Sequence, residues 1–152
     1  YHYFYPKTFI KYALTGVNTE QFAKIFVPEK DDNINLNISI NINSDYKNGA
    51  IAITPSISFI ESDKTFLIIE CTCHFKIDPS DWSKISNTGK SDAIVSKNII
   101  MNMISIALGT LRGVLHSKTE NTDYNKYFLP LIDISEFEIG ELLMVKSEEH
   151  II

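Results

Sequence analysis

The stretch INLNISININ, residues 34–43, alternates branched aliphatic and small polar side chains without exception. The aliphatic members are Ile34, Leu36, Ile38, Ile40 and Ile42, and the residues between them are Asn or Ser. Because successive side chains of a strand point to opposite faces of a sheet, this period of two predicts a β-strand with one apolar face. That apolar face must be buried against another element of the fold.

Two further strands are predicted after this one. The polar loop at residues 44–49 ends in Asn48-Gly49, a pair that accepts positive φ angles and is typical of hairpins. Residues 50–60 form the next strand, in which Pro55 predicts an edge position or a bulge because proline lacks a ladder N–H. Residues 65–77 then complete an antiparallel meander.

Helical patterns lie on both sides of these strands. Residues 18–26 are predicted to form a short helix that Asn18 or Thr19 would cap, and Asp133 is predicted to start a last helix through Leu142. Between residues 91 and 117 the apolar residues recur at steps of three and four, which predicts one long amphipathic helix. These residues are Ile94, Val95, Ile99, Met103, Ile106, Ala107, Thr110, Leu111 and Val114. Strands and helices in separate blocks predict an α+β fold.

Length and composition exclude several classes of protein. A chain of 152 residues suits one domain spanning 1–152, and its net charge of −5 without a basic cluster disfavours a nucleic-acid partner. No uninterrupted apolar run reaches the ~18 residues that a membrane span needs, so we expect a soluble protein. Cys71 and Cys73 lie on one face of a predicted strand, where they cannot easily pair, which fits a reducing compartment.

The sequence contains no pattern that points to catalysis. His74 follows Cys71 and Cys73, but on a strand it points to the opposite face, so the three are not expected to bind a metal. Neither a glycine-rich phosphate loop nor a nucleophile elbow occurs, and the paired acids at 31–32 and 148–149 are expected to be solvated. An enzyme is therefore disfavoured, and no cofactor is expected. Arg112-Gly113 is interpreted as a helix end, with Arg112 on terminal carbonyls and Gly113 allowing close packing or a cap.

Several of these segments together resemble the SecB family of protein-export chaperones and its SecB-like relatives. The resemblance lies in the alternating strand at 34–38, the strand ending in Phe75-Lys76-Ile77, the step Thr110-Leu111-Arg112-Gly113 and the segment at 129–137. It covers residues 30–145 and leaves a divergent N-terminal segment, 1–30. It implies a four-stranded antiparallel meander sheet followed by a long helix and a C-terminal helix packed on one face. Homodimers or homotetramers in the cytoplasm are implied as well.

The activity that the resemblance implies is that of an ATP-independent chaperone, or holdase, which binds unfolded or precursor polypeptides in an apolar groove for protein export. The client-binding positions of the family fall on Ile34, Leu36, Ile38 and Phe75. Two other interpretations stay open: a SecB-like binding or assembly module for one folded partner, and an aliphatic stripe that only packs under the long helix.

The resemblance also implies a docking strand for the export motor SecA. Where the family carries an acidic residue that meets SecA, this chain has Ile68, and Phe66 falls at the neighbouring apolar contact position. The replacement of an acidic residue by isoleucine argues against a docking contact of the family's kind.

Overall fold

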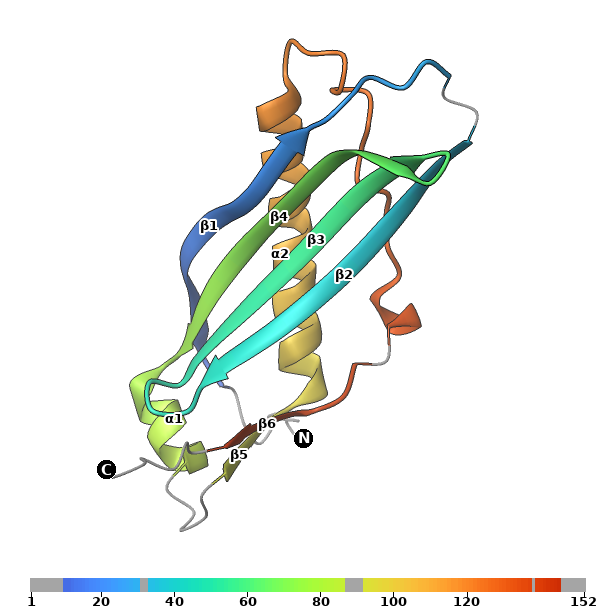
Figure 1. Ribbon diagram of the computed structural model, residues 1–152. Helices are drawn as coiled ribbons and strands as arrows, with labels where there is room; N and C mark the ends of the chain where they lie inside the picture. Colours follow the sequence, from blue (N-terminus) through green and yellow to red (C-terminus); the bar gives the residue numbers. More distant parts are fainter. Residues whose placement is uncertain (1–9, 31–32, 87–91, 138, 146–152) are drawn as a thin grey trace, which may run out of the picture.

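A computed structural model describes residues 10–30, 33–86, 92–137 and 139–145 of the chain. Its main layer is a four-stranded antiparallel sheet with the strand order β1-β4-β3-β2. The strands are β1 (Tyr12–Lys24), β2 (Ile34–Asp45), β3 (Ala50–Glu61) and β4 (Lys64–Ile77). One long helix, α2 (Lys97–Thr119), lies across one face of the sheet (Figure 1). The predicted α+β class and the four-stranded antiparallel sheet are confirmed, with β2, β3 and β4 as the meander and β1 added beside β4.

Shorter elements complete the chain. Helix α1 (Pro79–Ser86) follows β4, and the strands β5 (Asp92–Val95) and β6 (Leu142–Val145) pair antiparallel in a small second sheet. A short 3-10 turn, η2 (Ile134–Glu136), lies on the segment that leads back from α2 to β6. Figure 1 shows this returning segment running beside α2 on the side of the sheet where β2 lies. We call residues 128–142 the returning segment below.

The core lies between the inner face of the sheet and α2. Strand β3 contributes Ile53, Ile57 and Phe59, each at most 2% exposed. The buried residues of α2 follow a helical period: Ile100, Met103, Ile104, Ala107, Leu108, Leu111, Leu115 and Thr119. Ile106 was predicted on this face but is 41% exposed, because the buried positions fall at 103–104 and 107–108 and leave 105–106 on the outer side of the helix.

Helix α2 is long and apolar enough, by length and composition, to cross a membrane. The core helix of a soluble protein passes the same test, and the buried stripe of α2 packs on the sheet. Its start differs from the prediction, since residues 92–95 form β5. The hydroxyl of Ser96 then caps the helix by accepting a hydrogen bond from the amide of Ile99.

Two helix predictions are wrong. Residues 18–24 belong to β1, which pairs with β4 along its whole length, so pairing in the sheet overrides the local capping signals of Asn18 and Thr19. The last helix is also absent from residues 133–137 and 139–145. Asp133 does cap a turn there, but the chain leaves η2 after Glu136 and extends into β6. Residues 8–9, 31–32, 87–91 and 148–149 lie outside the described residues.

Pro55 lies in a central strand and the pairing around it keeps its register, so at this residue neither the predicted edge position nor the predicted bulge occurs. It is buried on β3 and stands opposite Ile40 of β2, while the pairing of β3 with β4 passes from Ile53↔Cys73 to Ser56↔Glu70. The hydroxyls of Thr54 and Thr72 form a hydrogen bond of 2.8 Å in this interval. A side-chain link therefore joins β3 to β4 beside the residue that has no amide hydrogen.

The hairpin between β2 and β3 forms as predicted. Gly49 has a φ of 60°, in the region that favours glycine, and a Cβ at this position would lie 2.7 Å from Cγ of Trp82. The turn is thus fitted against the buried Trp82 of α1, and both its backbone angle and its surroundings require glycine.

Candidate functional site

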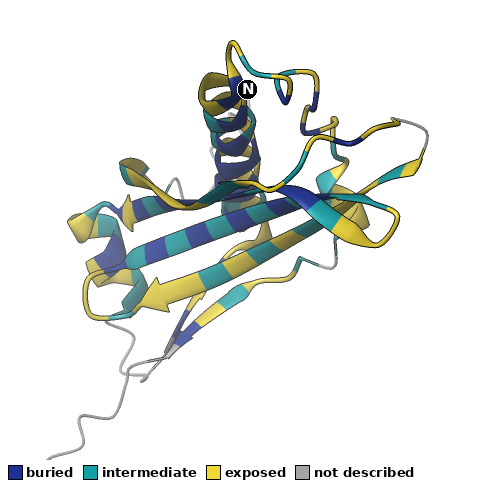
Figure 2. Cartoon of the chain, turned by 45° about the horizontal axis from the view of Figure 1, so that its top comes forward, coloured by how far each residue is buried: buried dark blue, intermediate teal, exposed yellow. Residues whose placement is uncertain are grey.

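Strand β2 forms one edge of the sheet, and its aliphatic face is only partly covered. Ile34, Ile38, Ile40 and Ile42 are half-buried against the core, whereas Leu36 is 37% exposed. Figure 2 shows β2 as alternating exposed and intermediate residues, next to β3, where buried residues alternate with intermediate ones. Helix α2 therefore covers the centre of the sheet more completely than this edge.

Beside β2 the surface forms an elongated hollow, which we call the β2 groove. It consists of two cavities of about 350 and 480 Å³ that share Ile38 and Phe137 in their walls. Strand β2 forms one wall of the first cavity, the returning segment contributes a second, and Ile100 and Ile104 of α2 also line it. The aliphatic and aromatic lining is Ile38, Ile40, Ile42, Ile100, Ile104, Leu131, Ile132, Phe137, Ile139 and Leu142. Each volume lies within the range of ~300–1,000 Å³ typical of ligand pockets.

The returning segment is tied to α2 by one arginine. Arg112 donates from Nε to the carbonyl of Leu129 over 3.2 Å and from Nη2 to the carbonyl of Pro130 over 3.1 Å. The predicted helix end at Arg112-Gly113 is wrong, because α2 continues to Thr119 and Arg112 binds carbonyls of another segment. Gly113 is exposed, and an added Cβ would meet nothing within 4 Å, so it serves neither close packing nor a cap.

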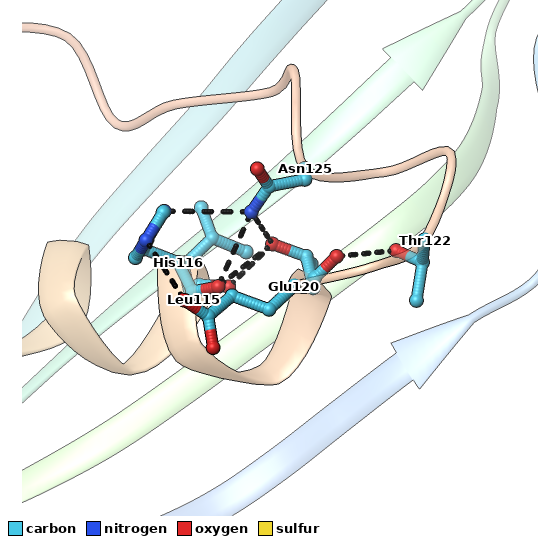
Figure 3. Close-up of polar contacts among 6 residues, drawn as sticks. Leu115, His116, Glu120, Thr122 and Asn125 are labelled. Atoms are coloured by element: carbon cyan, nitrogen blue, oxygen red, sulfur yellow. Dashed lines mark hydrogen bonds and ion pairs between the residues drawn. The ribbon is translucent and has the colours of Figure 1, made fainter.

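The turn after α2 is held by a hydrogen-bonded network (Figure 3). The amide of Asn125 donates to the carbonyl of His116 and to the hydroxyl of Thr119, which itself donates to the carbonyl of Leu115 over 2.7 Å. The hydroxyl of Thr122 donates to the carbonyl of Thr119 over 2.6 Å. These bonds satisfy carbonyls at the helix end and fix the direction in which the chain turns back toward the groove.

Three acidic residues line the groove. Asp133 and Glu136 line one cavity and Glu141 lines the other, and none of the described residues that line either cavity is Lys or Arg. Hydrogen bonds from the hydroxyl and amide of Ser135 lower the pKa of the Asp133 carboxyl. The groove thus joins an apolar lining to a rim that is negative at neutral pH.

The predicted client-binding residues lie in different environments in the structure. Ile38 lines both cavities, Leu36 lies two residues further along the same face, and Ile34 is half-buried at the start of β2. Phe75 is 1% exposed and lies in the core, with its ring 6.3 Å from that of Tyr12. Of the four predicted residues, Ile38 alone lines the groove; Ile34 and Leu36 share its face of β2 without lining either cavity, and Phe75 lies in the core.

The two predicted docking residues also differ in exposure. Phe66 is fully buried, and its ring packs against those of Phe59 and Tyr127, at 6.1 and 4.9 Å between centroids. Ile68 is half-buried and stands opposite Ser58 of β3. A buried core residue such as Phe66 is not available to a partner in this conformation, so only Ile68 is presented at all.

Cys71, Cys73 and His74 are arranged as the strand pattern predicts. Both thiols are buried in the core, and burial raises the pKa of each, whereas the ring of His74 meets the amide of Asn18 at 3.1 Å. Within the described residues, no group of three His, Cys, Asp or Glu side chains is placed to hold a metal ion.

Sequence reasoning missed much of the groove. Ile40 and Ile42 continue the alternation that singled out Ile34, Leu36 and Ile38, so the same pattern already contained them. Ile100 and Ile104 fall on the helical stripe of α2. Phe137 and the residues after it carried no such signal, because they were expected in a helix.

Comparison with known proteins gives likenesses of structure, two of which follow. A scan against protein-family models and a search of curated proteins found no match. The Mycobacterium tuberculosis SecB-like chaperone Rv1957, in complex with a ChAD peptide from the Rv1956 HigA1 antitoxin, is similar with a TM-score of 0.47 and 7% identity over 80% of this chain and 91% of that chain. A protein of unknown function from Streptococcus agalactiae is similar with a TM-score of 0.41 and 14% identity, over 83% of this chain and all of that chain. Both likenesses are of backbone arrangement.

Proposed function

We propose that this protein binds extended, non-native segments of polypeptide in the β2 groove and holds them without ATP, as a SecB-like holdase does. The observation that supports the proposal is the groove itself: an apolar channel open along a strand edge, with Ile38 and Phe137 at its centre. Apolar burial contributes ~25 cal/mol per Å², so such a channel binds aliphatic side chains without reading a particular sequence. Unfolded chains expose side chains of this kind.

The dimensions of the groove also favour a second function. Two cavities of about 350 and 480 Å³ accept only a few side chains each, which suits one short segment of a dedicated partner. In that case the protein would be a binding or assembly module for one folded protein. The two functions differ in what they bind, since a holdase must accept many unrelated unfolded chains.

The deciding experiment measures aggregation of a chemically denatured protein after dilution, with and without this protein and in the absence of ATP. A holdase is expected to suppress light scattering at a near-stoichiometric ratio for several unrelated substrates. The absence of suppression at several-fold excess would contradict it. Recovery of one stable stoichiometric partner, without affinity for unfolded chains, would support the dedicated module.

A further inference from the structure

We propose that the bound segment is a cationic, extended strand that adds to the free edge of β2 and so extends the sheet from four strands to five. This inference rests on the proposed function and names how the groove recognises its ligand. The occupant carries aliphatic side chains at alternate positions and lysine or arginine at its ends.

The two edges of the sheet differ in a way that bears on strand addition. Edge strands of natural proteins are protected by charges, bulges and proline, because a row of unpaired N–H and C=O groups recruits other chains. Strand β1 has such protection: its pairing with β4 shifts register twice, and it carries Glu20 and Lys24. Strand β2 pairs with β3 over 12 residues without a shift, and residues 34–44 contain neither a charge nor a proline.

The outer edge of β2 is also unoccupied by backbone. The strand pairs with β3 alone, and no backbone hydrogen bond joins its outer edge to another segment within the described part of the chain. Alternate amide and carbonyl groups of β2 therefore point away from the sheet, where an added strand can use them. The returning segment lines the groove but forms no strand pairing with β2 among the described residues, so this edge is free.

The groove matches the side chains of such an added strand. On a strand beside β2, every second side chain would share the face of Ile38, Ile40 and Ile42 and enter the apolar cavities, while the others would lie level with the exposed Asn41. A helix presents its apolar residues at steps of three and four and has no free backbone groups for the edge. The site is therefore complementary to an extended segment.

Charge selects the occupant. Asp133, Glu136 and Glu141 line the groove without a Lys or Arg among its described lining residues, which favours basic residues beside the aliphatic ones of the occupant. A second copy of this chain, with a net charge of −5, would bring like charge to this rim. The observations thus favour a basic peptide segment over self-association through β2.

The test uses a fluorescent peptide as long as β2, 12 residues, in which Val and Ser alternate between lysine pairs. Two further versions carry N-methyl groups on alternate backbone amides, the first on one alternate set and the second on the other. Their side chains are identical, but opposite edges of the peptide strand are blocked. Fluorescence anisotropy is expected to show one methylated peptide binding at least ~tenfold more weakly than the other, since only one edge pairs with β2. Hydrogen exchange is expected to slow at alternate amides of β2 when the unmethylated peptide binds.

Three controls define the other outcomes. A peptide with glutamate in place of the lysines is expected to bind several-fold more weakly at low salt, with a smaller difference at high salt. Equal binding of both methylated peptides, or of an isomer with its valines regrouped at helical spacing, would overturn strand addition while leaving groove binding in place. A solution dimer whose β2 amides are protected without peptide would overturn it too. Failure of every peptide to bind, together with no suppression of aggregation, would instead remove the proposed function.

Discussion

Removing the hydrogen bonds between Arg112 and the returning segment is expected to destabilise the protein by an amount that can be worked out from their number and exposure. Arg112→Met keeps most of the aliphatic stem but removes both hydrogen bonds, those to the carbonyls of Leu129 and Pro130. A hydrogen bond from a charged donor contributes roughly 1.5–3 kcal/mol when well buried, but here one bond is exposed and the other only partly buried. We therefore expect the free energy of unfolding to fall by about 1–2 kcal/mol in total.

For a chain of this size that loss lowers Tm by roughly 2–8 °C. The measurement is thermal unfolding followed by circular dichroism, together with hydrogen exchange across residues 128–137. Exchange in this range is expected to quicken, because the segment has lost its tie to α2. Arg112→Lys, which can keep one bond, is expected to lie between wild type and Arg112→Met.

Lys97→Met is the matched control, since it removes a positive charge from the exposed first residue of the same helix. It is expected to change the free energy of unfolding by less than ~0.5 kcal/mol. Peptide affinity is expected to fall in Arg112→Met, because a loosened groove wall must be ordered again on binding. Unchanged Tm and unchanged exchange in residues 128–137 of Arg112→Met would show that these hydrogen bonds do not hold the returning segment to α2.

Three further predictions concern the turn, the core and pH. Gly49→Ala is expected to cost at least ~1 kcal/mol in the free energy of unfolding by urea titration, because alanine is strained at positive φ and its Cβ would meet Trp82; wild-type stability would show that the turn tolerates a side chain. Leu111→Ala removes a fully buried side chain and is expected to lower the free energy of unfolding by ~2–5 kcal/mol. Leu131→Ala changes a residue that is 93% exposed, so it is expected to leave the free energy of unfolding within ~0.5 kcal/mol of wild type and to weaken peptide binding. Equal losses of stability in the two variants would contradict this. Because the pKa of Asp133 is lowered, its contribution to stability is fully present above the ordinary pKa of an aspartate and is lost as pH falls through the lowered value. Wild type is therefore expected to be more stable than Asp133→Asn near neutral pH and to lose that difference in acid, as followed by circular dichroism. Parallel acid profiles of the two proteins would contradict this expectation.

The strand pattern was the most informative part of the sequence. Strict alternation from Ile34 to Asn43 predicted β2 with its correct faces, because the pleat fixes which side chains share a side. Helical spacing likewise predicted α2. Ile106 is nevertheless exposed, because the spacing alone does not decide which of two neighbouring positions lies in the buried stripe. These signals depend on periods that the backbone itself imposes.

The remaining errors arose where tertiary contacts decide the structure. Asn18 and Thr19 are good helix caps, but pairing with β4 makes this region a strand. Asp133 caps only one turn, after which residues 142–145 pair with β5. The returning segment, and with it one wall of the groove, follows from these long-range contacts, which no local pattern in residues 128–142 specifies.

If the β2 groove binds polypeptide, a bulky side chain that fills the groove must weaken the binding. Gly140 lines the first cavity, and an added Cβ there would meet nothing within 4 Å, so Gly140→Phe places a ring at the groove without a backbone clash. Gly113→Phe adds the same ring at an equally open position, about 13 Å along α2 from Ile104.

Binding of the lysine-flanked peptide is measured by anisotropy for both variants and wild type, with Tm as a check on folding. Gly140→Phe is expected to bind at least ~tenfold more weakly at unchanged Tm, and Gly113→Phe is expected to match wild type. Wild-type affinity in both variants would contradict the claim that the β2 groove is the binding site.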